Sequence, residues 1–166
     1  MEKKWLLDAC LKALGLTLLA VLACACTIPR VALMRDPLSP EEHIDLGVSY
    51  EKRGELDAAL KEYKTAARKK PLAYLYMGNI YFQQGSLGEA IKSYKKAITK
   101  TGSPEAYNNL AWLYYVSGTK RDEAEQLAAR AVELSPASDA FRDTLEKIRE
   151  KKDWSKAHIP LQGARA

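Results

Sequence analysis

The chain has 166 residues, 47% hydrophobic and 28% charged, with a formal net charge of +5. This length suits one domain, and the mild charge, mixed with acids, argues against a nucleic-acid-binding protein. A solvated charged surface is the favoured interpretation over contact with an anionic membrane. The three cysteines, Cys10, Cys24 and Cys26, precede the main domain, so that domain has no disulfide and no thiolate metal site.

The N-terminus has the layout of an export leader. Lys3 and Lys4 precede the run Leu11–Ala25, which is apolar apart from Lys12 and Thr17. A charged start, an apolar stretch and an ending of small residues predict a secretory leader over residues 1–23. The early lysines favour a cytoplasmic N-terminus and an exported remainder.

The end of the leader, Val21-Leu22-Ala23-Cys24, resembles a bacterial lipobox. The resemblance implies cleavage before Cys24, a diacylglycerol on its thiol and acylation of the new amino group by a fatty acid such as palmitate. Cys26, after Ala23-Cys24-Ala25, is the alternative lipidated residue. Two acyl chains would anchor the protein stably, facing the periplasm of the bacterial cell envelope.

Two alternatives to a lipoprotein remain open for this segment. Between Lys12 and Arg30 lie 17 residues, slightly fewer than the roughly 20 that a spanning helix needs. Residues 1–23 could therefore stay as an uncleaved membrane anchor, or be a plain cleaved signal. Residues 24–39 contain Pro29 and Pro37 and no helical period, which predicts a tether before a domain over residues 40–152.

Three stretches of that domain share one spaced pattern: a large, a small and an aromatic residue, then a glycine, then small residues in a second segment. The sets are Leu46-Gly47-x-x-Tyr50 with Gly54, Ala59, Tyr63 and Ala66; Met77-Gly78-x-x-Tyr81 with Gly85, Ala90, Tyr94 and Ala97; and Leu110-Ala111-x-x-Tyr114 with Gly118, Ala124, Ala128 and Ala131. Small residues let two helices approach closely, and the glycines permit a left-handed turn between them. The pattern resembles the tetratricopeptide repeat (TPR), which implies an all-α solenoid of helical hairpins that holds another protein.

The spacing predicts three repeats and a C-terminal capping helix. The third repeat carries one extra residue after Gly118, and Ala128 stands where the other two have Tyr. Phe141, Leu145 and Ile148 form the apolar stripe of the capping helix, and residues 153–166 are expected to form a flexible tail. The expected helices are 41–53, 56–69, 72–84, 87–100, 104–117, 121–134 and 138–151.

The chain offers little for catalysis. His43 falls where TPR units place a packing residue, and His158 lies in the tail without clustered ligands. No Gly-rich phosphate loop, zinc-protease motif or nucleophile elbow is present. We therefore expect a protein that is not an enzyme and that uses no metal, cofactor or small-molecule substrate.

The TPR resemblance implies a concave groove, lined by the first helix of each repeat, that receives a peptide or a helix. The middle of the predicted groove consists of apolar, aromatic and amide side chains. These are Leu75, Asn79, Phe82, Asn108, Trp112 and Tyr115. The alternative is that Phe82 and Trp112 simply pack against the next helix or the tail. The subtype that clamps a C-terminal carboxylate is not supported, because Ile44 and Val48 stand where it needs Lys and Asn.

The predicted function is a membrane-anchored scaffold or recruitment factor with a protein or peptide partner in the bacterial envelope. The alternative is an uncleaved, membrane-anchored assembly or chaperone factor for a secretion, pilus or export machine. The two hypotheses differ in the anchor and in how selective the groove is for one partner.

Overall fold

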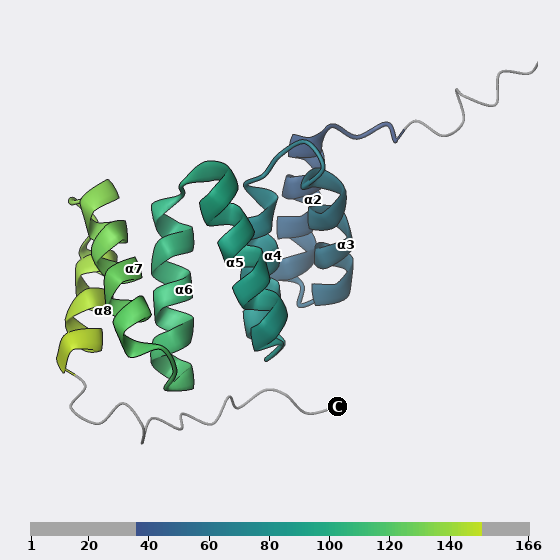
Figure 1. Ribbon diagram of the computed structural model, residues 1–166. Helices are drawn as coiled ribbons and strands as arrows, with labels where there is room; N and C mark the ends of the chain where they lie inside the picture. Colours follow the sequence, from purple (N-terminus) through teal and green to yellow (C-terminus); the bar gives the residue numbers. More distant parts are fainter. Residues whose placement is uncertain (1–35, 151–166) are drawn as a thin grey trace, which may run out of the picture. The chain divides into compact units, whose positions relative to one another are not determined.

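The computed structural model describes residues 36–150, which form seven α-helices without a strand (Figure 1). The predicted leader with Cys24 and Cys26, most of the predicted tether and the predicted tail lie outside the described residues. Among the described helices, none combines the length and apolar character needed to cross a bilayer. The helices are α2 (Pro40–Lys52), α3 (Leu56–Ala66), α4 (Ala73–Gln83), α5 (Leu87–Thr101), α6 (Pro104–Ser117), α7 (Arg121–Leu134) and α8 (Asp139–Glu150).

The predicted all-α solenoid is confirmed. Helices pack in consecutive pairs, α2 with α3, α4 with α5 and α6 with α7, and α8 packs on α6 and α7 at the predicted place of the cap (Figure 1). The glycine inside each pair is left-handed, with φ of 77° at Gly54, 73° at Gly85 and 65° at Gly118. A side chain at these positions would be strained, which explains why the pattern repeats a glycine there.

The start of α2 is fixed by a capping box. The Glu42 backbone N–H donates to Ser39 Oγ at 3.2 Å, and the Ser39 N–H donates to Glu42 Oε2 at 2.7 Å. The hydrogen bond from the Ser39 backbone is the main reason that the pKa of Glu42 lies below its ordinary value. Pro40 follows at the first helical position, where no N–H is needed.

One helix boundary differs from the sequence prediction by three residues, whereas the others agree to within one residue. We expected the second helix to run to residue 69, but α3 ends at Ala66. The N–H groups of Lys69 and Lys70 both donate to the Ala66 carbonyl, which turns the chain out of the helix before Pro71. The corresponding residues Leu46 and Met77 are only 31 positions apart, against 34 in a usual TPR, and the last turn of α3 is lost to this shorter spacing.

The first two repeats pack through a glycine and a tyrosine. A Cβ added to Gly47 would lie 2.4 Å from the Tyr63 ring, and one added to Gly78 would lie 2.4 Å from the Tyr94 ring. Tyr63 is fully buried and Tyr94 is 2% exposed. The tyrosine rings thus occupy the volume that a side chain on the facing helix would need, as the sequence pattern predicted.

The core forms two clusters, one around α3 and α4 and one from α4 to α8. Tyr63 anchors the first cluster, and Leu110, Tyr114 and Ile148 belong to the second. His43 is buried, with 5% exposed, and its Nδ1 lies 2.6 Å from Glu62 Oε2. This position agrees with the packing role that its place in the repeat predicted.

Candidate protein-binding face

The six predicted groove residues lie on two neighbouring helices. Leu75, Asn79 and Phe82 are on α4, whereas Asn108, Trp112 and Tyr115 are on α6. The two helices are in contact, and Asn109 Nδ2 donates to Asn79 Oδ1 across them at 3.0 Å. We call these six residues the α4–α6 face.

The aromatic part of this face is a stacked pair on α6. The Trp112 and Tyr115 rings have centroids 5.1 Å apart and planes at 28°. Lys147 of α8 places its Nζ 5.8 Å from the Trp112 ring centroid. Both rings are partly exposed, and Tyr115 also packs against the core cluster. A ligand would therefore meet a rigid aromatic surface with a cation at its edge.

The two asparagines have different roles. Asn79 Oδ1 accepts hydrogen bonds from Tyr94 Oη at 2.9 Å and from Asn109 Nδ2, so this oxygen ties α4 to α5 and α6. Asn108 Oδ1 is buried and has no hydrogen-bond partner within the described residues. A buried acceptor without a donor costs about 1–3 kcal/mol of stability, and because this oxygen is buried a ligand on the surface does not contact it.

The two remaining residues belong mainly to the protein's own packing. Leu75 is 8% exposed and is part of the core cluster, so a ligand would reach little of it. Phe82 is partly exposed and packs against the same cluster. The accessible chemistry of the face therefore rests on Trp112, Tyr115 and the rim of Phe82.

Comparisons with known proteins agree with the observed fold of helical hairpins. The model of the tetratricopeptide repeat family matches residues 44–104. No curated protein matches the sequence significantly. Solved TPR domains superpose on the described helices. One is the first TPR of Spaghetti (RPAP3) bound to an HSP90 peptide, which gives a TM-score of 0.62 at 21% identity. The match covers 69% of this chain and 93% of that chain.

Two further TPR domains superpose similarly. The Sgt2 TPR domain from Aspergillus fumigatus gives a TM-score of 0.62 at 18% identity, covering 68% of this chain and 78% of that chain. The second TPR domain of human RPAP3, in complex with an HSP70 peptide, gives a TM-score of 0.60 at 23% identity. The match covers 68% of this chain and 100% of that chain. The described helices form a TPR solenoid. At these identities the likeness establishes the fold alone.

Within the TPR solenoid, the first repeat differs chemically from a carboxylate clamp. Ile44 and Val48 are partly buried and pack against the first core cluster. Apolar side chains at these positions offer no cation or amide for a terminal carboxylate. The first repeat therefore presents apolar side chains where a carboxylate clamp presents a cation and an amide.

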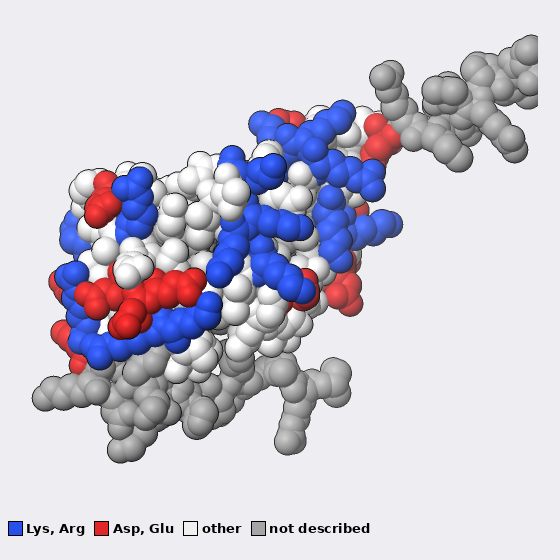
Figure 2. All heavy atoms as spheres, in the orientation of Figure 1, with Lys and Arg blue, Asp and Glu red and all other residues white. Residues whose placement is uncertain are grey.

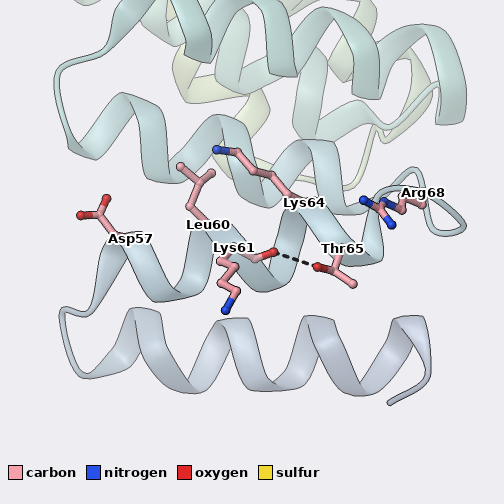
Figure 3. A pocket seen from close by; sticks show the side chains of 6 residues that line it. All are labelled: Asp57, Leu60, Lys61, Lys64, Thr65 and Arg68. Carbon is pink, nitrogen blue, oxygen red and sulfur yellow. Dashed lines mark hydrogen bonds between the residues drawn. The ribbon is translucent and has the colours of Figure 1, made fainter. Parts of the chain in front are cut away.

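A second surface, on α3, was not predicted from the sequence. An open hollow of about 380 Å³ lies there, lined by residues of α3 and the turn that follows it (Figure 3). Its lining residues are Asp57, Leu60, Lys61, Lys64, Thr65 and Arg68. The signal in the sequence was the helical spacing of Lys61, Lys64 and Arg68, which puts three cations on one side of the helix. Among the described residues no group of three or more His, Cys, Asp or Glu could hold a metal ion.

Proposed function

We propose that this protein is a non-enzymatic TPR interaction module that binds a peptide or helix of a partner protein on the α4–α6 face. The observation that carries the proposal is the stacked, partly exposed Trp112–Tyr115 pair on α6. Tryptophan and tyrosine supply large contact area at low entropic cost and are enriched at binding hot spots. Asn108 is partly exposed on the same helix, and an amide side chain can hydrogen-bond a peptide backbone.

The solved neighbours support a peptide ligand. The RPAP3 domains are bound to the HSP90 peptide SRMEEVD and the HSP70 peptide SGPTIEEVD. Both peptides are acidic at their C-terminal ends, whereas this chain has Ile44 and Val48 at the clamp positions. We therefore infer a segment that presents apolar or aromatic side chains, with an acidic group near Lys147 where the segment passes α8.

We further propose that the module is a lipoprotein scaffold or recruitment factor of the bacterial envelope, anchored through Cys24. The support is the leader sequence, which ends in Val21-Leu22-Ala23-Cys24. The intact mass of protein extracted from membranes tests this directly. We expect cleavage before Cys24 plus lipid in the wild type, and loss of that species in Cys24→Ala. A full-length, unmodified mass would contradict the lipoprotein and favour the anchored assembly factor.

The binding proposal is tested with peptides selected from a displayed random library on the full-length protein. We expect aromatic and apolar peptides, whose affinity falls at least about thirtyfold in the Trp112→Ala/Asn108→Ala double variant because hot-spot truncation costs about 2 kcal/mol or more. Fluorescence anisotropy measures the affinity, and circular dichroism checks that the variant keeps its helices.

The matched control removes one aromatic ring and one amide from elsewhere on the domain. Tyr107→Ala/Gln126→Ala does this, since Tyr107 lies beside Arg130 and Gln126 is exposed on α7. This control should bind the selected peptides like the wild type. Undiminished binding by a folded Trp112→Ala/Asn108→Ala variant would reject the α4–α6 face as the binding site.

A further inference from the structure

Lysine and arginine side chains gather over α3 and α5, whereas acidic and basic side chains alternate over α7 and α8 (Figure 2). Between Lys61 and Lys100 the chain holds nine basic residues and two acids, Glu62 and Glu89, a net charge of +7. The described residues as a whole hold 17 basic and 18 acidic residues, so this charge is local. We define the basic face as Lys61, Lys64, Arg68, Lys69, Lys70, Lys92, Lys95, Lys96 and Lys100.

Most of this charge is not neutralised inside the protein. All nine side chains belong to exposed residues. Within the described part of the chain only Lys70, Lys92 and Lys95 form ion pairs, with Glu41, Glu89 and Glu123. The other six cations have no acidic partner among the described residues. A concentrated, uncompensated positive surface attracts anionic macromolecules or membranes.

Two of the cations are held over the helix between α3 and α5. Lys64 Nζ lies 5.9 Å from the Tyr81 ring centroid, and Lys96 Nζ lies 5.2 Å from that of Tyr74. Both tyrosines are on α4, which packs against α3 on one side and α5 on the other. The cation–π contacts therefore bring charge from both outer helices over α4, so that the basic face is continuous across two repeats.

We propose that the basic face binds the phosphate headgroups of an anionic phospholipid surface. Eight of the nine cations are lysines, which act as mobile point charges and suit a fluid layer of headgroups better than fixed bidentate recognition. Single-stranded nucleic acid would call for exposed aromatic rings on which bases stack. Here Tyr74 and Tyr81 already carry lysine ammonium groups over their rings.

The geometry leaves the proposed peptide site accessible at the same time. Along α4, Tyr74 and Tyr81 are offset by about 80–160° from Leu75, Asn79 and Phe82, because successive residues of an α-helix rotate by about 100°. A lipid surface on the basic face would therefore approach a side of α4 different from the one that contributes to the α4–α6 face. The domain could be oriented on the membrane while its peptide site faces away from the headgroups.

The predicted leader also favours a lipid surface as the partner of the basic face, although the basic face could bind headgroups without a membrane anchor. The predicted tether of 16 residues, 24–39, spans at most about 55 Å when extended. Anchoring would keep the domain within that distance of headgroups, where weak attraction by several lysines gains from a high effective concentration. No peptide partner is needed for this interaction, so its test is separate from that of the proposed function.

The experiment measures lysine acetylation by mass spectrometry on the full-length protein in lipid nanodiscs. Discs of phosphatidylcholine alone are compared with discs that also contain phosphatidylglycerol. We expect Lys61, Lys64, Lys96 and Lys100 to react at least about threefold more slowly in the anionic discs, because headgroups cover them. Exposed Lys52 of α2 is the internal control and should react equally in both. High salt should remove the protection by screening.

Two charge variants distinguish the effect of the basic face from the effect of the protein's net charge. Lys61→Glu/Lys100→Glu should lose most of the protection at the remaining lysines, whereas Lys52→Glu/Arg121→Glu, with the same change in net charge outside the basic face, should keep it. All four residues are exposed and helical, so both variants should fold. Equal acetylation in the two kinds of disc would overturn the proposal. So would tight binding of an RNA oligonucleotide at physiological salt without any effect of lipid composition, which would assign the face to nucleic acid.

Discussion

The first two repeats and the third fill the space between their paired helices with different residues. Gly47 faces Tyr63 and Gly78 faces Tyr94, and a Cβ added to either glycine would lie 2.4 Å from the facing ring. In the third repeat the equivalent residues are Ala111 and Ala128, both fully buried. A glycine with a tyrosine, or an alanine with an alanine, fills the space between two helices. The residues of each pair are therefore matched, and neither member can be exchanged between repeats by itself.

The largest effect is expected from Gly78→Leu, which breaks the pairing in the second repeat. The leucine side chain would occupy the volume of the buried Tyr94 ring. We expect a loss of more than about 3 kcal/mol in the free energy of unfolding, or no folded protein at all. Thermal melting followed by circular dichroism measures it.

A matched control exists on the next helix. Gly88 of α5 has no atom within 4 Å of the position that a Cβ would take. Gly88→Leu should therefore leave the melting temperature unchanged or raise it, since leucine is the better helix former. Similar melting of the Gly78 and Gly88 variants would refute the assigned packing.

A second set of variants rebuilds the pairing of the first repeat in the third. Ala128→Tyr alone should cost about 1–3 kcal/mol, because the ring would meet the Cβ of Ala111. Adding Ala111→Gly should recover part of that loss, although Ala111→Gly alone should cost about 1 kcal/mol through its lower helix propensity. Urea denaturation of the four proteins gives the coupling energy. Additive losses would show that the two positions do not face each other.

A smaller effect is expected from the titration of Tyr63 in the first repeat. Burial, then the 2.8 Å hydrogen bond from Tyr63 Oη to Glu51 Oε2, raises the pKa of Tyr63 above its ordinary value of 10.0. The folded protein thus holds this proton more tightly than the unfolded chain. The resulting stability is complete below about pH 10 and is lost as the pH rises through the folded-state pKa.

Tyr63→Phe removes this titration. At neutral pH the variant should be less stable by about 1 kcal/mol, because the hydrogen bond to Glu51 is lost. Above about pH 10 the difference should shrink, because the unfolded wild-type chain then releases the Tyr63 proton, whereas the folded protein must keep it. Urea denaturation at both pH values measures it, and a difference that does not change with pH would contradict the assigned cause.

The sequence predicted the fold well because its evidence was local and repeated. The three glycines and the small residues of the repeats each occupy the place that their spacing indicated. The end of α3 was not predicted because it depends on the turn between Ala66 and Pro71. The backbone hydrogen bonds to the Ala66 carbonyl in that turn are seen only in the structure. Expected positions were correct to within about a turn even there.

The site was predicted less completely, for a physical reason. The sequence pattern assigned Asn79 and Asn108 to one face, but only the structure shows that Asn79 Oδ1 is engaged by Tyr94 and Asn109 while Asn108 Oδ1 is not. These partners come from other helices. The basic face was not predicted because only the total charge was considered. In that total, the positive charge between Lys61 and Lys100 is offset by acidic residues nearer both ends of the domain.

Side-chain NMR of the full-length protein, titrated with a peptide that it selects, tests the protein-binding face at the level of single residues. We predict that the Trp112 indole N–H and the Asn108 side-chain amide shift first and most, together with Tyr115. Signals from Lys61 to Arg68 on the basic face should stay in place. Shifts centred on α3 or α7, with Trp112 and Asn108 unmoved, would contradict the α4–α6 face as the protein-binding site.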